Sequence, residues 1–406
     1  MSAITVPESG EHRLPPRFAG RLTHTASSTP AGLGVARLVV GLAAGLLAIT
    51  ASSTIALAKE LALPAVTGPH AVGRVELALT DATRSDPFAT DGRPRELAVW
   101  IWYPAVAGSS GPAAPYLPPT WAELANSSGA LSQDLSAVST NSIAGAPLEG
   151  RPPVVVLMPG LGQPVAAYSA LAEDLASRGY GVVGINPTGS TAVVVFPDGH
   201  VVPATPAGGI DAALLSDVPG WYAEAARVAD VWTADASFVV KTLDATPPAI
   251  GALDFDHVAY VGHSMGGAAA FESCREDPRC AAAVDLDGTL WTDVRHTGLT
   301  APSLLLRHDQ SGACDGFCEA ANADFATIKA AGDAQQFSVA GSQHMDFSDL
   351  GLLRGPEDTQ LPLGPIDAER MTMITRDLVG SFLDEHIHEV AVGAIAEAVA
   401  RYPELS

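Results

Sequence analysis

Short apolar runs alternate with amphipathic helical patterns along most of the chain. Segments such as 153–160 and 257–262 are apolar at consecutive positions, which is typical of parallel strands buried on both faces. Segments 165–179 and 222–245 instead have the period of helices. Strands are expected at 72–79, 97–104, 153–160, 180–187, 257–262, 281–287, 303–309 and 335–341, and helices at 165–179, 222–245 and near 319–331. This alternation predicts an α/β fold: a mainly parallel central sheet with helices on both faces.

Two long segments have no such pattern. Residues 105–150 are rich in Ser, Ala, Gly and Pro, and residues 190–209 are rich in Gly, Pro and Val. We expect both to be loops over the carboxyl ends of the strands, where sheets of this kind bind ligands. Trp121, Trp221 and Trp291, in or near these loops, either line an apolar surface or pack as ordinary core residues.

The amino-terminal region predicts export. Residues 1–37 form a polar leader with several arginines, and residues 38–58 contain no charged side chain. An apolar core followed by small residues is typical of a signal peptide, here cleaved before Lys59, whereas an uncharged stretch of this length also suits a membrane anchor. We therefore expect a protein that is secreted or tethered to the membrane, with its catalytic domain at residues 66–406.

Charge and cysteine content limit the binding partners, crosslinks and cofactors to be expected. The chain has 45 acidic and 22 basic residues, a net charge of −23, and no basic patch suited to nucleic acid. Its four cysteines predict two disulfides in an exported protein, most simply Cys274–Cys280 and Cys314–Cys318, and their spacing is unlike that of zinc knuckles. No metal or organic cofactor is expected, and the oligomeric state stays open.

The segment Gly262-His263-Ser264-Met265-Gly266 is a G-x-S-x-G motif between a predicted strand and a predicted helix. This context is the one that the nucleophile elbow of α/β-hydrolases requires. The glycines leave room for backbone that approaches closely around a strained serine. Ser264 is therefore the predicted nucleophile, and the Met265 N–H at the helix start is a predicted oxyanion donor.

Further candidates follow from the order of elements in this fold. The loop after the third strand supplies a second oxyanion donor, for which we expect the Leu161 N–H. The base follows the last strand, a position held by His344, whereas His263 and His308 precede it. The acid that orients this base is Asp287 or Asp309, both at strand ends. The residues alone do not distinguish these two candidates.

Several motifs together resemble the platelet-activating factor acetylhydrolase family of the plasma or isoform II type, particularly its bacterial members. They are PGLGQPVAAYSALAEDLASRGYGVVGINPTGS, GHSMGG, DPRCAAAVDLDGTLW and GSQHMDFSDL, within residues 70–385. The resemblance implies that Asp287 is the acid beside Ser264 and His344, with an oxyanion hole at Leu161 and Met265. The sequence departs from the family at Met158-Pro159, where members often have Ser-His.

The combined prediction is a serine ester hydrolase that cleaves short-chain acyl esters, including those of phospholipids, through an acyl-enzyme. A lipase, a cutinase-like enzyme or a polyester hydrolase is the alternative within the same chemistry. A non-catalytic α/β-hydrolase-fold protein that binds partners at the cell surface is the alternative from another class. The expected partner is a small-molecule or lipid ester, with membrane association through residues 38–58.

Overall fold

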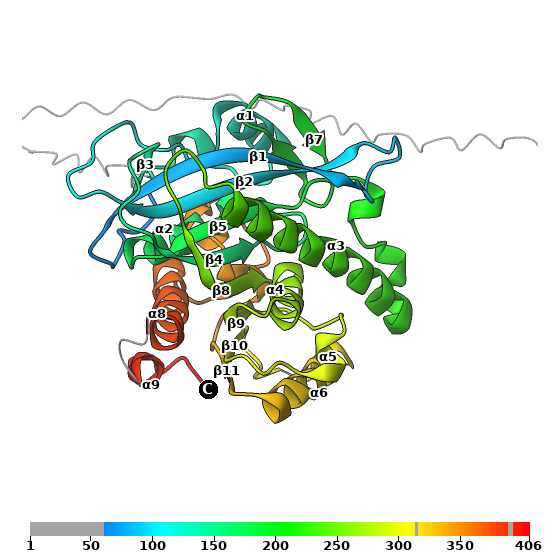
Figure 1. The fold of residues 1–406 in the computed structure, drawn as a ribbon. Helices are drawn as coiled ribbons and strands as arrows, with labels where there is room; N and C mark the ends of the chain where they lie inside the picture. Colours follow the sequence, from blue (N-terminus) through cyan, green and yellow to red (C-terminus); the bar gives the residue numbers. More distant parts are fainter. Residues whose placement is uncertain (1–60, 313–315, 389–392) are drawn as a thin grey trace, which may run out of the picture. The chain divides into compact units, whose positions relative to one another are not determined.

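A nine-stranded sheet runs through the part of the chain that the computed structural model describes, residues 61–312, 316–388 and 393–406 (Figure 1). Its order is β11-β10-β9-β8-β4-β5-β2-β1-β3. Only the β1–β2 and β2–β5 pairs are antiparallel, so the predicted mainly parallel sheet is confirmed. The strands are β1 (Ala71–Ser85), β2 (Pro94–Ala105), β3 (Ser142–Ala144), β4 (Pro153–Met158), β5 (Gly181–Asn186), β8 (Asp254–His263), β9 (Cys280–Leu286), β10 (Ser303–Arg307) and β11 (Ala334–Ser338).

Helices cover both faces of this sheet because its central strands are apolar on both sides. In β4, Val154 and Val156 pack into one core and Val155 and Leu157 into the other, and all four are fully buried. Helices α2, α8 and α9 contribute to one core, and α3, α4 and α6 to the other (Figure 1). The helices are α1 (Pro119–Ser128), α2 (Ser169–Ser177), α3 (Val218–Ala245), α4 (Met265–Glu276), α5 (Val294–Thr297), α6 (Gly316–Ala331), α7 (Leu350–Leu353), α8 (Ala368–His386) and α9 (Ala394–Ala400).

The two segments expected to be loops contain short regular elements instead. Residues 105–150 include α1 and β3, and residues 190–209 include the hairpin of β6 (Val193–Val195) and β7 (Val201–Pro203). Helix α1 begins at Pro119, which suits a first helical position because proline has no N–H to leave unpaired. These elements are too short for their periodicity to be distinguished in a segment rich in small residues.

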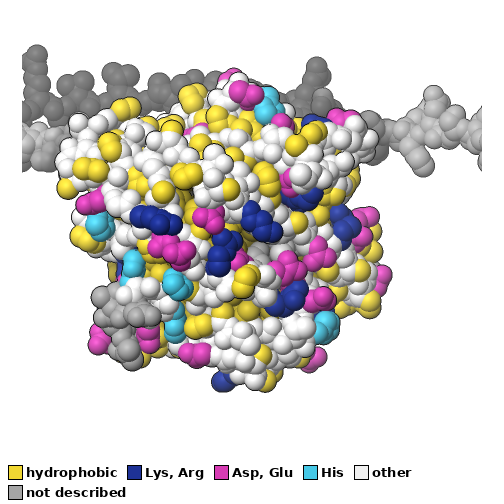
Figure 2. All heavy atoms as spheres, in the orientation of Figure 1, with side chains coloured by type: hydrophobic (Ala, Val, Ile, Leu, Met, Phe, Trp, Pro, Cys, Tyr) yellow, Lys and Arg dark blue, Asp and Glu magenta, His cyan; other side chains and the backbone are white. Residues whose placement is uncertain are grey.

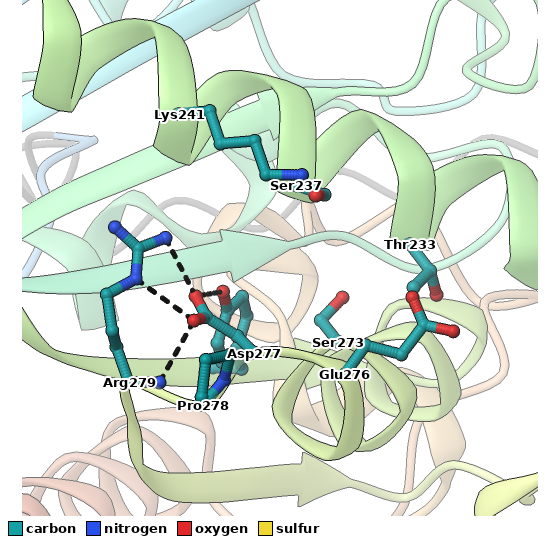
Figure 3. A pocket seen from close by; sticks show the side chains of 9 residues that line it. Thr233, Ser237, Lys241, Ser273, Glu276, Asp277, Pro278 and Arg279 are labelled. Atoms are coloured by element: carbon teal, nitrogen blue, oxygen red, sulfur yellow. Dashed lines mark hydrogen bonds and ion pairs between the residues drawn. The ribbon is translucent and has the colours of Figure 1, made fainter.

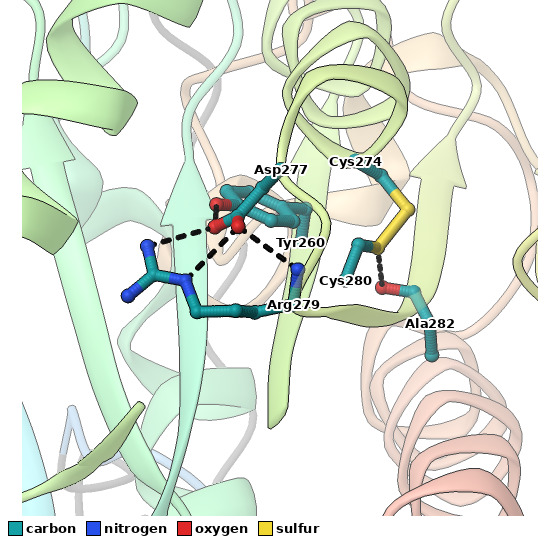
Figure 4. The surroundings of a disulfide bond; sticks show 6 residues. All are labelled: Tyr260, Cys274, Asp277, Arg279, Cys280 and Ala282. Carbon is teal, nitrogen blue, oxygen red and sulfur yellow. Dashed lines mark hydrogen bonds and ion pairs between the residues drawn. A yellow bond between two sulfur atoms is a disulfide. The ribbon is translucent and has the colours of Figure 1, made fainter. Parts of the chain in front are cut away.

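A disulfide joins the end of α4 to the start of β9. Cys274 and Cys280 are bonded, with their Cα atoms 5.1 Å apart, as predicted (Figure 4). Cys318 is also disulfide-bonded, and Cys314, its expected partner, lies outside the described residues. The crosslink joins β9, the strand that precedes Asp287, to α4, the helix that follows Ser264.

The predicted leader at 1–37 and the predicted signal peptide or anchor at 38–58 lie outside the described residues. Within the described ranges, no helix combines the length and the hydropathy that a bilayer crossing requires.

Charged side chains of both signs are interspersed on the face of the molecule in Figure 2. Arginine charge is neutralised locally: the fully buried Arg95, for example, forms ion pairs with Asp86 and Asp235. In the surface view, the Lys and Arg side chains are separated by acidic and uncharged ones on this face.

Candidate active site

Ser264 lies in the sharp turn between β8 and α4, with φ 56° and ψ −118°. A Cβ at Gly262 would collide with the carbonyl group of Gly266, and a Cβ at Gly266 would collide with those of Met158 and Pro159. Both glycines of the motif are thus required by backbone that approaches closely. The strained serine conformation is held by the fold around it, including a bond from the Ser264 N–H to the carbonyl oxygen of Leu286 at 2.9 Å.

His344 joins Ser264 to Asp287. The Nε2 atom of His344 lies 3.0 Å from Ser264 Oγ, and its Nδ1 lies 2.6 Å from Asp287 Oδ2. A carboxylate only accepts hydrogen bonds, so Nδ1 carries the proton of the neutral ring and Nε2 is free to accept from the serine hydroxyl. The structure therefore aligns the three side chains in the order needed to activate a serine.

Asp287 follows β9 and is held with φ 58° by a bond from its N–H to the Leu306 carbonyl at 2.7 Å. Its side chain is only 2% exposed. Burial alone would raise the pKa of Asp287, but hydrogen bonds from His308 and His344 outweigh burial and hold it well below its ordinary value. The carboxylate is therefore ionised whenever His344 acts as a base.

Asp309, the alternative acid, is engaged elsewhere. Its carboxylate accepts hydrogen bonds from the N–H groups of Gly341 at 2.7 Å and Ser311 at 2.8 Å. These bonds, that from Gly341 above all, lower the pKa of Asp309 to about 2. It has no hydrogen bond to His344, so the structure brings together His344 and Asp287 and leaves Asp309 as a residue that orders the loop after β10.

The predicted oxyanion donors are two backbone N–H groups, one in the turn after β4 and one at the start of α4. The turn after β4 packs on the start of α4, where the carbonyl groups of Met158 and Pro159 approach Gly266. Within the described residues, neither the Leu161 N–H in this turn nor the Met265 N–H at the start of α4 donates a hydrogen bond. Both donors remain available to a ligand, as an oxyanion hole requires.

His263, inside the elbow motif, belongs to a buried chain of hydrogen bonds that the sequence did not reveal. The Gly160 N–H donates to Tyr168 Oη at 3.0 Å, the Tyr168 hydroxyl lies 2.7 Å from His263 Nδ1, and His263 Nε2 lies 2.9 Å from the carbonyl oxygen of His344. Burial and the nearby His344 lower the pKa of His263 to about 3. The ring is therefore neutral, with Nε2 donating and Nδ1 accepting. Its hydrogen bonds join the turn after β4, the elbow and the segment that carries His344.

His308 is a second imidazole on Asp287. Its Nδ1 lies 2.8 Å from Asp287 Oδ1 and 2.9 Å from Oδ2, and its backbone N–H donates to Oδ1 at 2.9 Å. In the sequence it stands only as a histidine at the end of a predicted strand. A contact to a residue on the neighbouring strand leaves no local pattern, so sequence reasoning could place His308 near the site but not on the carboxylate.

Two comparisons with known proteins bear on this arrangement, whereas no family model matches the chain. A curated protein of Arthroderma benhamiae, a probable 1-alkyl-2-acetylglycerophosphocholine esterase, is 29% identical over 255 residues, which cover 58% of this chain and 61% of the fungal protein. The solved structure of a ferulic acid esterase from Streptomyces cinnamoneus matches with a TM-score of 0.72 at 31% identity, covering 86% of this chain and 99% of that chain. The chain belongs to the α/β-hydrolase esterases. The resemblance to acetylhydrolases stated from the sequence is confirmed by the fungal relative.

An apolar cleft of about 600 Å³ lies beside the aligned side chains of this esterase. It reaches Met345, next to His344, and Gly162, next to Leu161. Trp121 lines it, whereas Trp221 and Trp291 are not among its lining residues. Most of the other lining side chains are aliphatic and come from α1 and its flanking segments, from β6 and from residues 345–362. They include Leu117, Leu124, Leu131, Leu135, Val193, Leu350, Leu353 and Leu361. Part of the segment 105–150 therefore does form a wall of the site, as expected.

A second cavity in the esterase, of about 410 Å³, lies away from Ser264 (Figure 3). Thr233, Ser237 and Lys241 of α3 face the turn between α4 and β9 across it. In that turn Asp277 accepts hydrogen bonds from Tyr260 and Arg279 (Figures 3 and 4). None of the aligned residues lines this cavity. Across the described ranges, no group of three or more His, Cys, Asp and Glu side chains is arranged to hold a metal ion.

Proposed function

We propose that this esterase hydrolyses carboxylic esters through an acyl-enzyme on Ser264. The observation that carries the proposal is the hydrogen-bonded series Ser264 Oγ, His344 and Asp287, with successive distances of 3.0 and 2.6 Å. Family membership supports the same reaction, because the matched relatives are both esterases.

In the proposed mechanism, His344 Nε2 accepts the proton of Ser264 Oγ while that oxygen attacks the ester carbonyl carbon. The N–H groups of Leu161 and Met265 stabilise the negative charge on the tetrahedral intermediate. The His344 imidazolium, supported by ionised Asp287, then protonates the departing alcohol. A water molecule activated by His344 attacks the acyl-enzyme in the same way and releases the acid.

The proposed substrate is an ester of a short acyl chain, with a small-molecule or lipid alcohol. The fungal relative supports this class, since its name describes an esterase for a 2-acetyl phospholipid. The apolar cleft supports a substrate that also carries an apolar group, because burying each CH₂ there contributes about 0.8 kcal/mol.

The size of the same cleft favours one second candidate, a lipase or polyester hydrolase. A cleft of about 600 Å³ with mostly aliphatic walls has room for far more than an acetyl group. In that case a long acyl chain or a polymer segment, rather than a short acyl group, occupies the cleft.

Hydrolysis of p-nitrophenyl esters from acetyl to palmitoyl tests these proposals in the purified protein. We expect turnover that peaks at acetyl or butyryl and falls at least about 10⁴-fold in Ser264→Ala. A peak at long chains supports the second candidate. Turnover retained by Ser264→Ala contradicts the proposed nucleophile, and absence of both turnover and fluorophosphonate labelling of Ser264 favours the non-catalytic binding protein.

We propose further that the esterase works outside the cytoplasm, secreted or tethered by residues 38–58. The Cys274–Cys280 bond supports an oxidising compartment, in addition to the export signal expected from the sequence. Fractionation of cells that produce the full chain, followed by amino-terminal sequencing, tests this location. A new terminus at Lys59 indicates cleavage, an intact chain in the membrane indicates a tether, and an intact cytoplasmic chain contradicts the proposal.

A further inference from the structure

The Asp287 carboxylate accepts hydrogen bonds from the side chains of two histidines. The carboxylate accepts from His344 Nδ1 on Oδ2 at 2.6 Å, and from His308 Nδ1 on both oxygens at 2.8 and 2.9 Å. The two imidazoles are similarly accessible, with side chains 41% and 44% exposed, whereas the carboxylate is 2% exposed. One buried negative charge thus supports two rings that can each take up a proton.

The His308 ring is fixed against this carboxylate from two directions. Its own backbone N–H donates to Asp287 Oδ1 at 2.9 Å, and the Asp287 N–H is bonded to the carbonyl of Leu306, two residues before His308. These bonds pin the end of β10 to the end of β9. Because a carboxylate only accepts, the neutral His308 ring carries its proton on Nδ1 and leaves Nε2 to take up a second one.

From this shared carboxylate we propose that His308 is a positioning residue that aims Asp287 at His344 and, once protonated, weakens the support that Asp287 gives to His344. The inference rests on the proposed esterase function. It adds that this activity depends on pH through His308. When His308 is neutral, Asp287 is free to stabilise the His344 imidazolium that forms during the reaction. When His308 carries a charge, the two cations compete for one carboxylate, and the transition state is less stable.

The surrounding groups shift the pKa of His308 upward. The groups that act on His308 are Asp287 from the neighbouring segment and Arg307 and Asp309 from its own, and His344 binds the same carboxylate. The hydrogen bond to Asp287 raises the pKa of His308 above its ordinary value of 6.5, against the opposing effect of burial. The weakening therefore begins above pH 6.5.

A pH profile of kcat/KM for p-nitrophenyl acetate tests the inference. In the wild type we expect a step of about tenfold on the acid limb from His308, in addition to the loss of activity when the base is protonated. His308→Asn retains a side-chain N–H donor near the position of Nδ1 but cannot titrate, so its profile should lack the tenfold step and keep only the loss of the base. His308→Ala removes the donor and should lower kcat about tenfold at pH 8 with little change in KM, and Asn should restore part of this loss.

His200→Asn is a matched control. His200 also lies beside an aspartate, with its Nδ1 2.6 Å from Asp198, and its side chain is 40% exposed, but it belongs to the β6–β7 turn. We expect the wild-type profile from this variant. Retention of the tenfold step in His308→Asn, or an unchanged kcat in His308→Ala, would overturn the inference.

Proton NMR separates this inference from the proposed function. Both Nδ1 protons face a buried carboxylate, so the wild type should show two strongly downfield imidazole N–H signals, of which His308→Asn loses one. If no substrate is turned over but both signals are present, the esterase proposal fails and the shared carboxylate stands. If turnover depends on Ser264 but only one signal is present in the wild type, the shared carboxylate is contradicted.

Discussion

Replacing Tyr168 by phenylalanine removes a single oxygen atom from the centre of the hydrogen-bond chain between Gly160 and His344. The hydroxyl accepts from the Gly160 N–H at 3.0 Å and lies 2.7 Å from His263 Nδ1, to which it donates. Tyr168 and His263 are each 1% exposed, and Gly160 is buried. The variant therefore leaves one buried donor and one buried acceptor without partners.

The expected cost follows from those two groups. A buried polar group left unpaired costs about 1–3 kcal/mol, which gives roughly 2–4 kcal/mol for the pair once the lost hydroxyl's own desolvation is included. Unfolding entropy is about 2.1 cal/mol/K per residue, so for a unit of roughly 340 residues the melting temperature should fall by about 3–6 °C. Since the chain also orients the turn that carries Leu161 and the backbone of His344, kcat should fall about tenfold or more.

Scanning calorimetry and steady-state hydrolysis of p-nitrophenyl acetate measure the two effects, with Tyr260→Phe as the control. Tyr260 is another buried tyrosine, and its hydroxyl donates to Asp277 Oδ2 at 2.7 Å, on the side of the second cavity. We expect this control to be less stable by about 1 kcal/mol with an unchanged kcat. If Tyr168→Phe melts lower but keeps the wild-type kcat, the chain stabilises the fold without positioning the reacting groups, and the reasoning is refuted.

Three further results are expected. Asp287→Asn should lower kcat/KM by about 10⁴-fold and Asp309→Asn by less than tenfold, and the reverse order would exclude Asp287 as the acid. Burial raises the pKa of Asp285 to about 8 from 3.8, so this carboxyl favours folding below pH 4 and loses that contribution as pH rises to 8. In Asp285→Asn, the free energy of unfolding measured with urea should lack this loss of about 1.4 kcal/mol per pH unit. If the free energies of unfolding of variant and wild type change in parallel with pH, Asp285 is ionised when folded. Leu124→Ser, at an exposed position of the cleft wall, should lower kcat/KM for long acyl esters about threefold to tenfold with acetate unchanged, whereas Val106→Ser, equally exposed outside the cleft, should alter neither.

The sequence predicts the central sheet well because its strands are buried on both faces. An uninterrupted apolar run such as that of β4 is visible without knowledge of its neighbours. The elbow is visible for a related reason, since its G-x-S-x-G motif occupies five consecutive residues, although Gly266 is also required by the approach of Met158 and Pro159 from another segment. Both features can be recognised from residues adjacent in sequence.

The partners of these residues depend instead on contacts between distant segments. Asp287 and Asp309 both end strands, and only the register of β9 beside β10 shows that one faces His344 while the other binds the turn at Gly341. The bond between Tyr168 and His263 spans 95 residues. Such pairs obey no sequence period, so the resemblance to a known family was needed to choose Asp287, and His308 and Tyr168 were found only in the structure.

The reacting side chains follow β8, β9 and β11, in one half of the sheet. Enzyme activity and tryptophan fluorescence can therefore report on different halves of the sheet. Trp100, Trp102 and Trp121 form a cluster in the other half, with ring centroids 5.6 and 5.8 Å apart. Hydrolysis therefore reports on order at one end of the sheet. In a variant in which Trp221, Trp232 and Trp291 are replaced by phenylalanine, tryptophan fluorescence reports on the cluster at the other end. If the end formed by β9, β10 and β11 opens first as denaturant is added, enzyme activity disappears while the emission of the cluster is still native.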